Sequence, residues 1–263
     1  MSRHVLGAQL YSCRQYCQTL PDIAQTLQKV RAIGYTAVQI SGFGPVAPQA
    51  VAQLVTDCGL TVAGTHMSWA SFLTDVDAVI ETHRLWNCTH AAIGALPEEY
   101  RCAEGLERFL AELPPVAETL LAAGIDFSYH NHAHEFMRIG PTGKEGGRKT
   151  WLAELYDRAD PRHLKAELDT YWIVAGGGDP AAWIRRCAGR QPLLHLKDMV
   201  IAPDRSQRFA PIGEGNLHWP AILAAAADSG VQWYLVEQDD CYGESCFDVL
   251  ETSYRNLQAM GLS

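Results

Sequence analysis

The sequence predicts an α/β fold, a single (β/α)8 TIM barrel that takes in residues 1–263. Eight short apolar runs recur along the chain, and segments with helical periodicity lie between them. Alternation of this kind implies parallel strands joined by right-handed crossovers. The length of 263 residues also fits, because one such barrel typically takes about 250 residues.

The expected strands are short apolar runs that end near glycine, histidine or acidic residues. They are Leu6–Tyr11, Ala37–Ile40, Thr61–Thr65, His90–Ile93, Asp126–His130, Leu164–Leu168, Leu193–Leu196 and Trp233–Val236. An open doubly wound sheet would usually carry a glycine-rich phosphate loop after its first strand, but neither GxGxxG nor GxxxxGKS/T occurs there. Eight units without such a loop favour a closed barrel.

The expected helices lie between the strands, and most end at a glycine, which commonly stops a helix. Their ranges are Asp22–Ile33, Pro48–Cys58, Phe72–Leu85, Ala103–Ala123, a helix opened by Asp179-Pro180, Ala221–Ser229 and Phe247–Met260. Two glycine-rich stretches are expected to be loops. We interpret Gly176–Gly178 as a loop that needs positive φ angles, and Gly140–Lys149 as either a lid or an ordinary exposed loop.

The composition is that of an ordinary globular protein with a large core, with 48% hydrophobic and 19% charged residues. The formal charge of −9 argues against a nucleic-acid partner, because binding to a phosphate backbone needs clustered Lys and Arg. No apolar stretch approaches the roughly 18 residues of a membrane span. Met1–Leu10 lacks a signal-peptide pattern, so we expect a cytoplasmic protein.

The eight cysteines are expected to be reduced structural thiols, as is usual in the cytoplasm. Cys13/Cys17 and Cys241/Cys246 are not spaced as CxxC. The abundant Trp and Tyr residues are compatible with a buried interface between copies of the chain, and core packing explains them equally well. A homo-oligomer is therefore compatible with the sequence.

Polar clusters follow the last four expected strands, and in a barrel these strand ends meet at one mouth, where active sites lie. At the end of strand five, His130 and His132 share one face because successive side chains alternate. Glu135 lies beyond the strand and can fold back over it. Three histidines and a glutamate within six residues are seldom only structural, so we expect this segment to be functional.

The next three strands add further polar groups. Glu167 and Asp169 share a face of strand six; Glu167 lies deeper and is suited to orienting a ligand, while Asp169 either binds a metal or caps a helix. His195 and Lys197 face inward from strand seven. Lys197 either holds a substrate oxygen or pairs with Asp198 or Glu167. Glu237 ends the hydrophobic strand eight.

Carboxylates and an imidazole that converge on one point indicate a divalent metal site. Carboxylate-rich sites suit Mn²⁺, Mg²⁺ or Co²⁺, and imidazole admits Zn²⁺ or Fe²⁺. A cation with an open coordination position would polarise a carbonyl or chelate adjacent hydroxyls. A further carboxylate or histidine within reach would then move a proton on the neighbouring carbon.

The chain resembles the sugar phosphate isomerase/epimerase superfamily with a xylose isomerase-like TIM barrel, which includes inosose dehydratases and ketose 3-epimerases. The resemblance covers nearly the whole chain. It runs from Leu6–Ser12 to Ile212–Trp219 and Val236–Asp239, and its most specific parts are Tyr129–Phe136, Leu168–Trp172 with the glycine run, and His195–Asp198.

This resemblance implies a metal shell of Glu, Asp, His and Glu from strands five to eight. Asp169, His195 and Glu237 match the last three positions directly. Relatives often have a glutamate where this chain has His130, so either His130 takes over ligation or Glu135 folds back to do so. We expect Glu135 to be the ligand, because it restores three carboxylates.

The resemblance also implies roles in catalysis and in substrate binding. Relatives that epimerise ketoses relay a proton between the carboxylates of strands five and eight through an enediolate. A strand-three histidine lines the pocket, and Gln39 stands where a strand-two glutamate is common. The expected catalytic residues are Glu135, Glu237, His132 and Lys197, and the expected substrate contacts are His66, His130, Trp172 and Lys197.

Three functional hypotheses follow. The main one is a metal-dependent isomerase or epimerase of a sugar or keto-polyol, with Mn²⁺, Mg²⁺, Co²⁺ or Zn²⁺ as cofactor. The second is a lyase in which the same intermediate expels a leaving group, as in dehydration of inosose or dehydroshikimate or cleavage of a 3-keto-glycoside. The third is a sugar-binding barrel that has lost activity.

Overall fold

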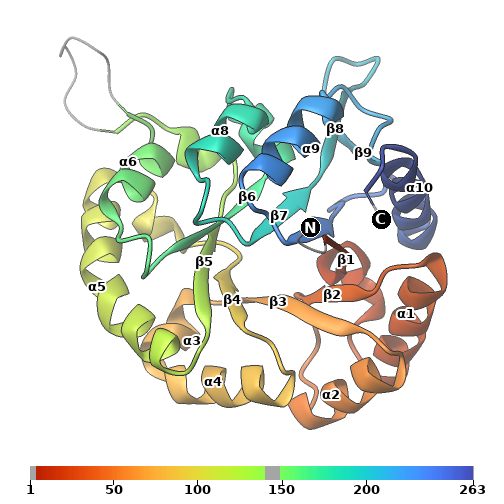
Figure 1. Ribbon diagram of the computed structural model, residues 1–263, viewed down its shortest axis with the longest axis horizontal. Helices are drawn as coiled ribbons and strands as arrows, with labels where there is room; N and C mark the ends of the chain where they lie inside the picture. Colours follow the sequence, from red (N-terminus) through yellow and green to blue (C-terminus); the bar gives the residue numbers. More distant parts are fainter. Residues whose placement is uncertain (1–3, 140–148, 263) are drawn as a thin grey trace.

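Parallel strands form a ring at the centre of the molecule, and helices surround it (Figure 1). The computed structural model describes residues 4–139 and 149–262. The strands of the ring are β1 (Val5–Gln9), β2 (Ala37–Ile40), β3 (Thr61–Met67), β4 (His90–Ile93), β5 (Asp126–His130), β6 (Lys165–Asp169), β7 (Leu193–Leu196) and β10 (Trp233–Val236).

The ring is closed in the order β1-β10-β7-β6-β5-β4-β3-β2, and each neighbouring pair is parallel. The predicted (β/α)8 fold is therefore confirmed. Five strands have the predicted bounds, and β1, β3 and β6 differ from prediction by one or two residues at their ends. The first strand stops at Gln9 because its side chain accepts a hydrogen bond from the backbone N–H of Tyr11, where a 3₁₀ turn begins.

The helices that surround the barrel mostly match the predicted segments. They are α1 (Leu20–Ile33), α2 (Pro48–Asp57), α3 (Trp69–Thr74), α4 (Val76–Leu85), α5 (Ala103–Ala122), α6 (Trp151–Arg158), α7 (Thr170–Ala175), α8 (Pro180–Arg186), α9 (Trp219–Asp228) and α10 (Cys246–Ala259), with 3₁₀ turns η1 (Leu10–Tyr16), η2 (Glu98–Tyr100) and η3 (His134–Phe136). The prediction of one helix over Phe72–Leu85 is wrong, because Asp75 interrupts it. The Asp75 carboxylate accepts a hydrogen bond from the backbone N–H of Ala78 and starts α4.

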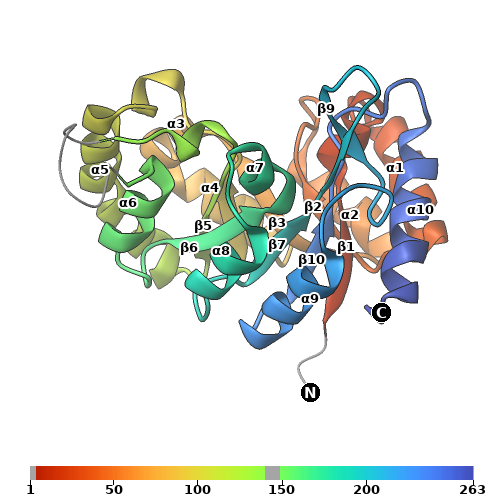
Figure 2. The same ribbon diagram turned by 90° about the horizontal axis from the view of Figure 1, so that it is seen from above.

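A two-stranded antiparallel hairpin, β8 (Asp198–Ile201) and β9 (Gln207–Ala210), follows β7 and was not predicted. Figure 2 shows this hairpin and α7 on one side of the barrel, opposite the side where β1 begins. The Asp198 carboxylate fixes its base. It accepts hydrogen bonds from the backbone N–H groups of Gly213 and Gly215 and from Nε1 of Trp219. Asp198 therefore positions the hairpin and is not the partner of Lys197.

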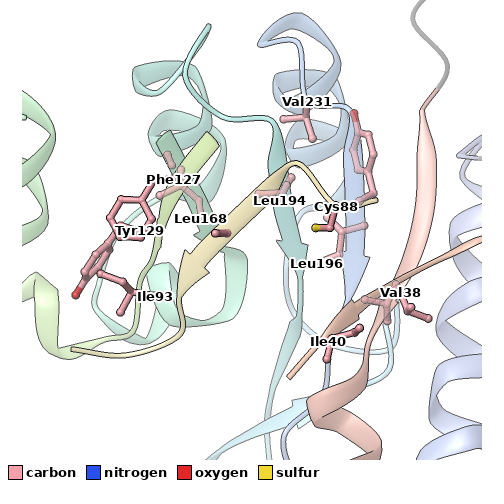
Figure 3. Packing of buried hydrophobic residues seen from close by; sticks show 14 of the residues in the cluster. Val38, Ile40, Cys88, Ile93, Phe127, Tyr129, Leu168, Leu194, Leu196 and Val231 are labelled. Carbon is pink, nitrogen blue, oxygen red and sulfur yellow. The ribbon is translucent and has the colours of Figure 1, made fainter. Parts of the chain in front are cut away.

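Side chains of the strands alternate between the barrel interior and the helices, as the two-residue period requires. Leu194 and Leu196 of β7 belong to the large core between barrel and helices, together with Leu168 of β6 (Figure 3). A small separate cluster consists of Ala37 of β2, Ala63 of β3, Leu193 of β7 and Leu235 of β10. In β7, His195 stands between the two outward leucines and so faces the interior.

Three further expectations concern loops, thiols and membranes. Gly177 has φ 81°, in agreement with the loop predicted at Gly176–Gly178, whereas most of the Gly140–Lys149 segment lies outside the described residues. The eight cysteines are present as free thiols. Among the described helices, none combines the length and apolar character that crossing a bilayer requires.

Candidate metal centre

Four potential metal ligands converge at the carboxyl ends of neighbouring strands. His130 ends β5, Asp169 ends β6, His195 lies in β7 and Glu237 directly follows β10. One donor atom from each lies within 4.8 Å of the others, and all four side chains are buried. Three of the four ligands expected from sequence are therefore brought together, with His130 as the fourth member of the group.

The Asp169 carboxylate divides its two oxygens between structure and site. Oδ1 accepts a hydrogen bond from the backbone N–H of Trp172 and caps α7. Oδ2 accepts no hydrogen bond from the described residues. It lies 3.2 Å from Nζ of Lys197 and 3.9 Å from Nε2 of His130. Both roles foreseen for Asp169, helix cap and ligand candidate, are thus compatible with one side chain.

The His195 imidazole connects two layers of the barrel interior. Its Nδ1 lies 2.9 Å from Oε2 of Glu237, and its Nε2 lies 2.6 Å from Oε1 of Gln39 and 3.1 Å from Oε1 of Glu167. Burial opposes its charge, but the two glutamates outweigh that effect and raise the pKa of His195 to about 10. Because Nε2 faces Gln39 and Glu167, Nδ1 is the nitrogen that faces the ligand group.

Glu167 lies one layer deeper and holds the rings above it. His66 Nε2 lies 2.5 Å from Oε1 of Glu167, and Gln39 Nε2 donates to Oε2 at 2.9 Å. Burial opposes ionisation, but His66 and His195 hold the pKa of Glu167 well below its usual range. A deep carboxylate that orients a metal-binding imidazole is the usual arrangement in metal centres, and it accords with the orienting role expected for Glu167.

Lys197 supplies a buried positive charge beside the ligand group. Its Nζ lies 3.0 Å from Oε2 of Glu237, 3.2 Å from Oδ2 of Asp169 and 3.0 Å from the carboxylate of Asp239. Burial opposes this charge, but the three carboxylates raise the pKa of Lys197 above its ordinary value. Burial, followed by repulsion from Glu237, raises the pKa of Asp239 to about 6. The ammonium group therefore faces the same two oxygens that a metal ion would use.

Glu135 lies apart from the four-residue group. Its carboxylate accepts a hydrogen bond from the hydroxyl of Tyr129 at 2.8 Å and one from the backbone N–H of His132 at 2.7 Å, and Nε2 of His134 lies 3.1 Å away. Burial opposes ionisation, but His134, His132 and Tyr129 together lower the pKa of Glu135. In this arrangement the carboxylate fixes the turn that follows β5.

A pocket of about 310 Å³ opens above the ligand group, within the range of small-ligand sites. His132 and Lys197 line it, and burial lowers the pKa of His132 to about 4. Trp172 packs against the ring of His132 at 5.2 Å between centroids. The residues around the pocket are Tyr11, Arg14, Ser41, His66, Gly94, Ala95, His130, His132, Lys197, Glu237 and Asp239.

The donor set fits a divalent cation. Two imidazoles and two carboxylates are ligands that first-row divalent metals accept. The donor atoms are close enough that small movements would give bonds of about 2.0–2.2 Å. Oδ2 of Asp169, which faces Nε2 of His130, has no hydrogen-bond partner among the described residues, and a buried polar atom normally has one.

Three participants were not assigned a role from sequence. Gln9 and Gln39 form a chain in which Nε2 of Gln9 donates to Oε1 of Gln39 at 2.9 Å. Asp239 holds Lys197. The available signal was a glutamine at the inward position of each of two otherwise small or apolar strands, VLGAQ and AVQI.

Comparison with known proteins relates most of the chain to one family of TIM barrels. The family model of xylose isomerase-like TIM barrels matches residues 27–245. A sugar phosphate isomerase/epimerase from Parabacteroides distasonis ATCC 8503 is 27% identical, with 98% of this chain and 94% of that chain covered and a TM-score of 0.80. No functionally curated protein is significantly similar in sequence.

Two other solved structures are similar in fold. An L-ribulose 3-epimerase is 19% identical, with 100% of this chain and 95% of that chain covered and a TM-score of 0.73. A probable 3-DHS dehydratase from Bacillus anthracis is 14% identical, with 97% and 98% covered and a TM-score of 0.67. At these identities the likeness concerns the fold alone.

Proposed function

Because the chain belongs to the xylose isomerase-like TIM barrel family, we propose that it is a metal-dependent isomerase or epimerase of a sugar or keto-polyol. The observation that carries this proposal is the group of four buried candidate ligands, two of which, His130 and Glu237, line the pocket. Proteins similar to the chain include a sugar phosphate isomerase/epimerase. A small polyhydroxylated carbonyl compound is therefore the proposed substrate.

His130, Asp169, His195 and Glu237 are the proposed metal ligands. His130 replaces Glu135 in this set, because Glu135 is already bound to Tyr129 and to the backbone of His132. Two imidazoles favour Mn²⁺, Co²⁺ or Zn²⁺ over Mg²⁺, which prefers oxygen ligands. When bound, the cation would polarise the substrate carbonyl and acidify the adjacent carbon.

The residues around the pocket supply binding and proton transfer. The Lys197 ammonium would stabilise negative charge on the substrate oxygen as the proton leaves. His132 lines the pocket and is the proposed proton acceptor; burial keeps its imidazole neutral at pH 7. Glu237, which follows β10, is the second proposed proton carrier. His66, which lines the pocket, would shape the substrate position, and Trp172 would act through His132, against which it packs.

A lyase is the second candidate, and the placement of Glu135 favours it. An epimerase that relays a proton between two carboxylates needs one from each side of the substrate. Here the β5 side presents the imidazoles of His130 and His132 to the pocket, whereas Glu135 belongs to a separate group with His132 and His134. A single base opposite Glu237 suffices to remove a proton and expel a leaving group.

Product analysis in deuterated water distinguishes the two reactions. The purified chain is stripped with a chelator, reloaded singly with Mn²⁺, Co²⁺, Zn²⁺ or Mg²⁺, and incubated with ketoses, inososes and 3-keto-glycosides. We expect a product with the same atoms as the substrate, except that a hydrogen next to the carbonyl has been exchanged for solvent deuterium. Loss of water or of an aglycone would instead identify a lyase.

The matched control is a pair of glutamate variants. Glu237→Gln is expected to lower turnover by several orders of magnitude, whereas Glu244→Gln, on the exposed loop before α10, leaves it unchanged. If no substrate is turned over and the protein binds sugars equally well with and without the cation, the catalytic proposal fails.

A further inference from the structure

Cys13 and Cys246 form a buried thiol pair at the seam where the first and last strands of the barrel meet. Their Sγ atoms lie 2.8 Å apart, within about 1 Å of the roughly 2.05 Å length of a disulfide bond. Cys13 lies in η1, which follows β1, and Cys246 is the first residue of α10, which follows β10. Both side chains are buried.

The hydrogen bond between the two thiols makes their acidities unequal. The hydrogen bond from Cys13 lowers the pKa of Cys246 although burial opposes it, and backbone N–H groups at the start of α10 act in the same direction. That hydrogen bond and burial raise the pKa of Cys13. The hydrogen bond that Cys13 donates therefore favours Cys246 as the attacking sulfur, while Cys13 carries the proton.

We propose that Cys13 and Cys246 are a modification site at which a low-molecular-weight disulfide, such as oxidised glutathione, introduces an intramolecular disulfide bond. Sγ of Cys246 attacks one sulfur of the oxidant, forms a mixed disulfide and releases one thiol. Cys13 then loses its proton, and its Sγ attacks Sγ of Cys246 and releases the second thiol. Two electrons and two protons pass to the oxidant.

A metal–thiolate site is the alternative that the geometry disfavours. Cys17 and Cys241 are near enough to the pair to interact with it electrostatically. Within residues 4–139 and 149–262, however, none of the groups of three or more metal-ligating side chains contains a cysteine. A disulfide bond needs only the two sulfurs that already touch.

The bond would join η1, which contributes to the pocket, to the start of α10, which follows the pocket-lining segment after β10. Oγ of Ser12 already accepts a hydrogen bond from the backbone N–H of Gln238, and Arg14 donates to the carbonyl oxygen of Asp239, both at 3.0 Å. Arg14 and Asp239 line the pocket. Because the bond would close nearly the whole chain into one loop, its effect on the unfolded state would be large.

The experiment uses the full chain, purified in reducing buffer and then incubated with oxidised glutathione. After alkylation and digestion without reduction, we expect one linked peptide pair that contains Cys13 and Cys246, and an intact mass lower by two hydrogens. Tm should rise by at least about 5 °C and return to its reduced value in dithiothreitol. Full alkylation of both thiols after oxidation, a stable glutathione adduct, or pairing with Cys17 or Cys241 would overturn the proposal.

Variants separate this bond from other effects of the oxidant. Cys246→Ser should lose both the link and the rise in Tm, whereas Cys187→Ser, at a buried thiol directly after α8, should keep both. A rise in Tm that persists in Cys246→Ser would contradict the assignment. Should that variant fail to fold, Cys13→Ser and the wild-type peptide map still decide the question.

Discussion

Nε2 of His195 lies 2.6 Å from Oε1 of Gln39, so Nδ1 of the same ring faces Oε2 of Glu237. The direction of the Gln39 amide is in turn set by Glu167, because a carboxylate only accepts hydrogen bonds and the Gln39 Nε2 donates to it. The amide oxygen is thereby turned toward the imidazole. A deep carboxylate thus determines which nitrogen of His195 is available for a cation.

Removal of this amide should weaken metal binding. Gln39→Leu leaves Nε2 of His195 without its closest acceptor, so the ring is held less firmly. Loss of such an orienting contact typically costs 10–100-fold in metal affinity, and we expect about 30-fold. Titration of chelator-treated, metal-free protein with Mn²⁺ measures the change in affinity.

Gln9→Leu is the matched control, because Gln9 contacts Gln39 and not His195. It should change Mn²⁺ affinity by no more than about threefold. Equal losses in the two variants would mean that the glutamine chain acts on the packing of the barrel and not on the ring of His195.

The identity of the β5 ligand is tested by a second pair of variants. His130→Ala should lower Mn²⁺ affinity by at least about 100-fold, because it removes one of four donors. Glu135→Gln should retain affinity but lower Tm, since the carboxylate that holds Tyr129 and the backbone of His132 becomes a weaker acceptor. The opposite pattern, with metal lost only in Glu135→Gln, would restore Glu135 as the ligand.

The sequence was sufficient to predict the barrel and three of the converging side chains. Strand bounds were predictable because the alternation that places Leu194 and Leu196 against the helices also places His195 inside. The same period brings Asp169 to the mouth. Convergence then follows from closure of the ring, which requires no knowledge of any side-chain contact.

Other features depend on contacts that no local pattern encodes. Whether Glu135 folds toward the mouth or away depends on the hydroxyl of Tyr129, an outward-facing residue whose partner is unpredictable from spacing. The hairpin β8–β9 depends on the nest of backbone N–H groups around Asp198, contributed by residues 15 and 17 positions later. Gln39 gave too weak a signal, because its role exists only through Glu167 and His195.

A buried histidine outside the site should contribute to the dependence of stability on pH. His83 is fully buried; Thr65 Oγ1 lies 2.9 Å from its Nε2, and its Nδ1 lies 2.8 Å from the carbonyl oxygen of Val79. Burial lowers the pKa of His83 below its ordinary value, despite the backbone hydrogen bonds. The folded state therefore resists protonation that the unfolded chain accepts below about pH 6.5.

The sign follows from proton uptake. The contribution of neutral His83 is complete above about pH 6.5 and is lost as the pH falls toward the folded-state pKa. His83→Gln removes this titration, so the free energy of unfolding should fall less steeply between pH 7 and pH 5 than in the wild type. Urea denaturation across this range measures the slope, and an unchanged slope would refute the assignment.

Lys197→Met should lower the stability of the metal-free protein but raise its affinity for metal. Nζ of Lys197 contacts Oδ2 of Asp169 and Oε2 of Glu237, two of the proposed ligand atoms. Without the ammonium group, buried carboxylates are left unpaired, so Tm of the metal-free protein should fall by about 10 °C. The same oxygens are freed from a competing cation, so Mn²⁺ should bind about tenfold more tightly and restore much of the lost Tm.

Asp239→Asn, which alters a partner of Lys197 outside the ligand group, should not strengthen Mn²⁺ binding. Weaker Mn²⁺ binding in Lys197→Met would mean that the lysine positions the carboxylates for the metal and does not compete with it.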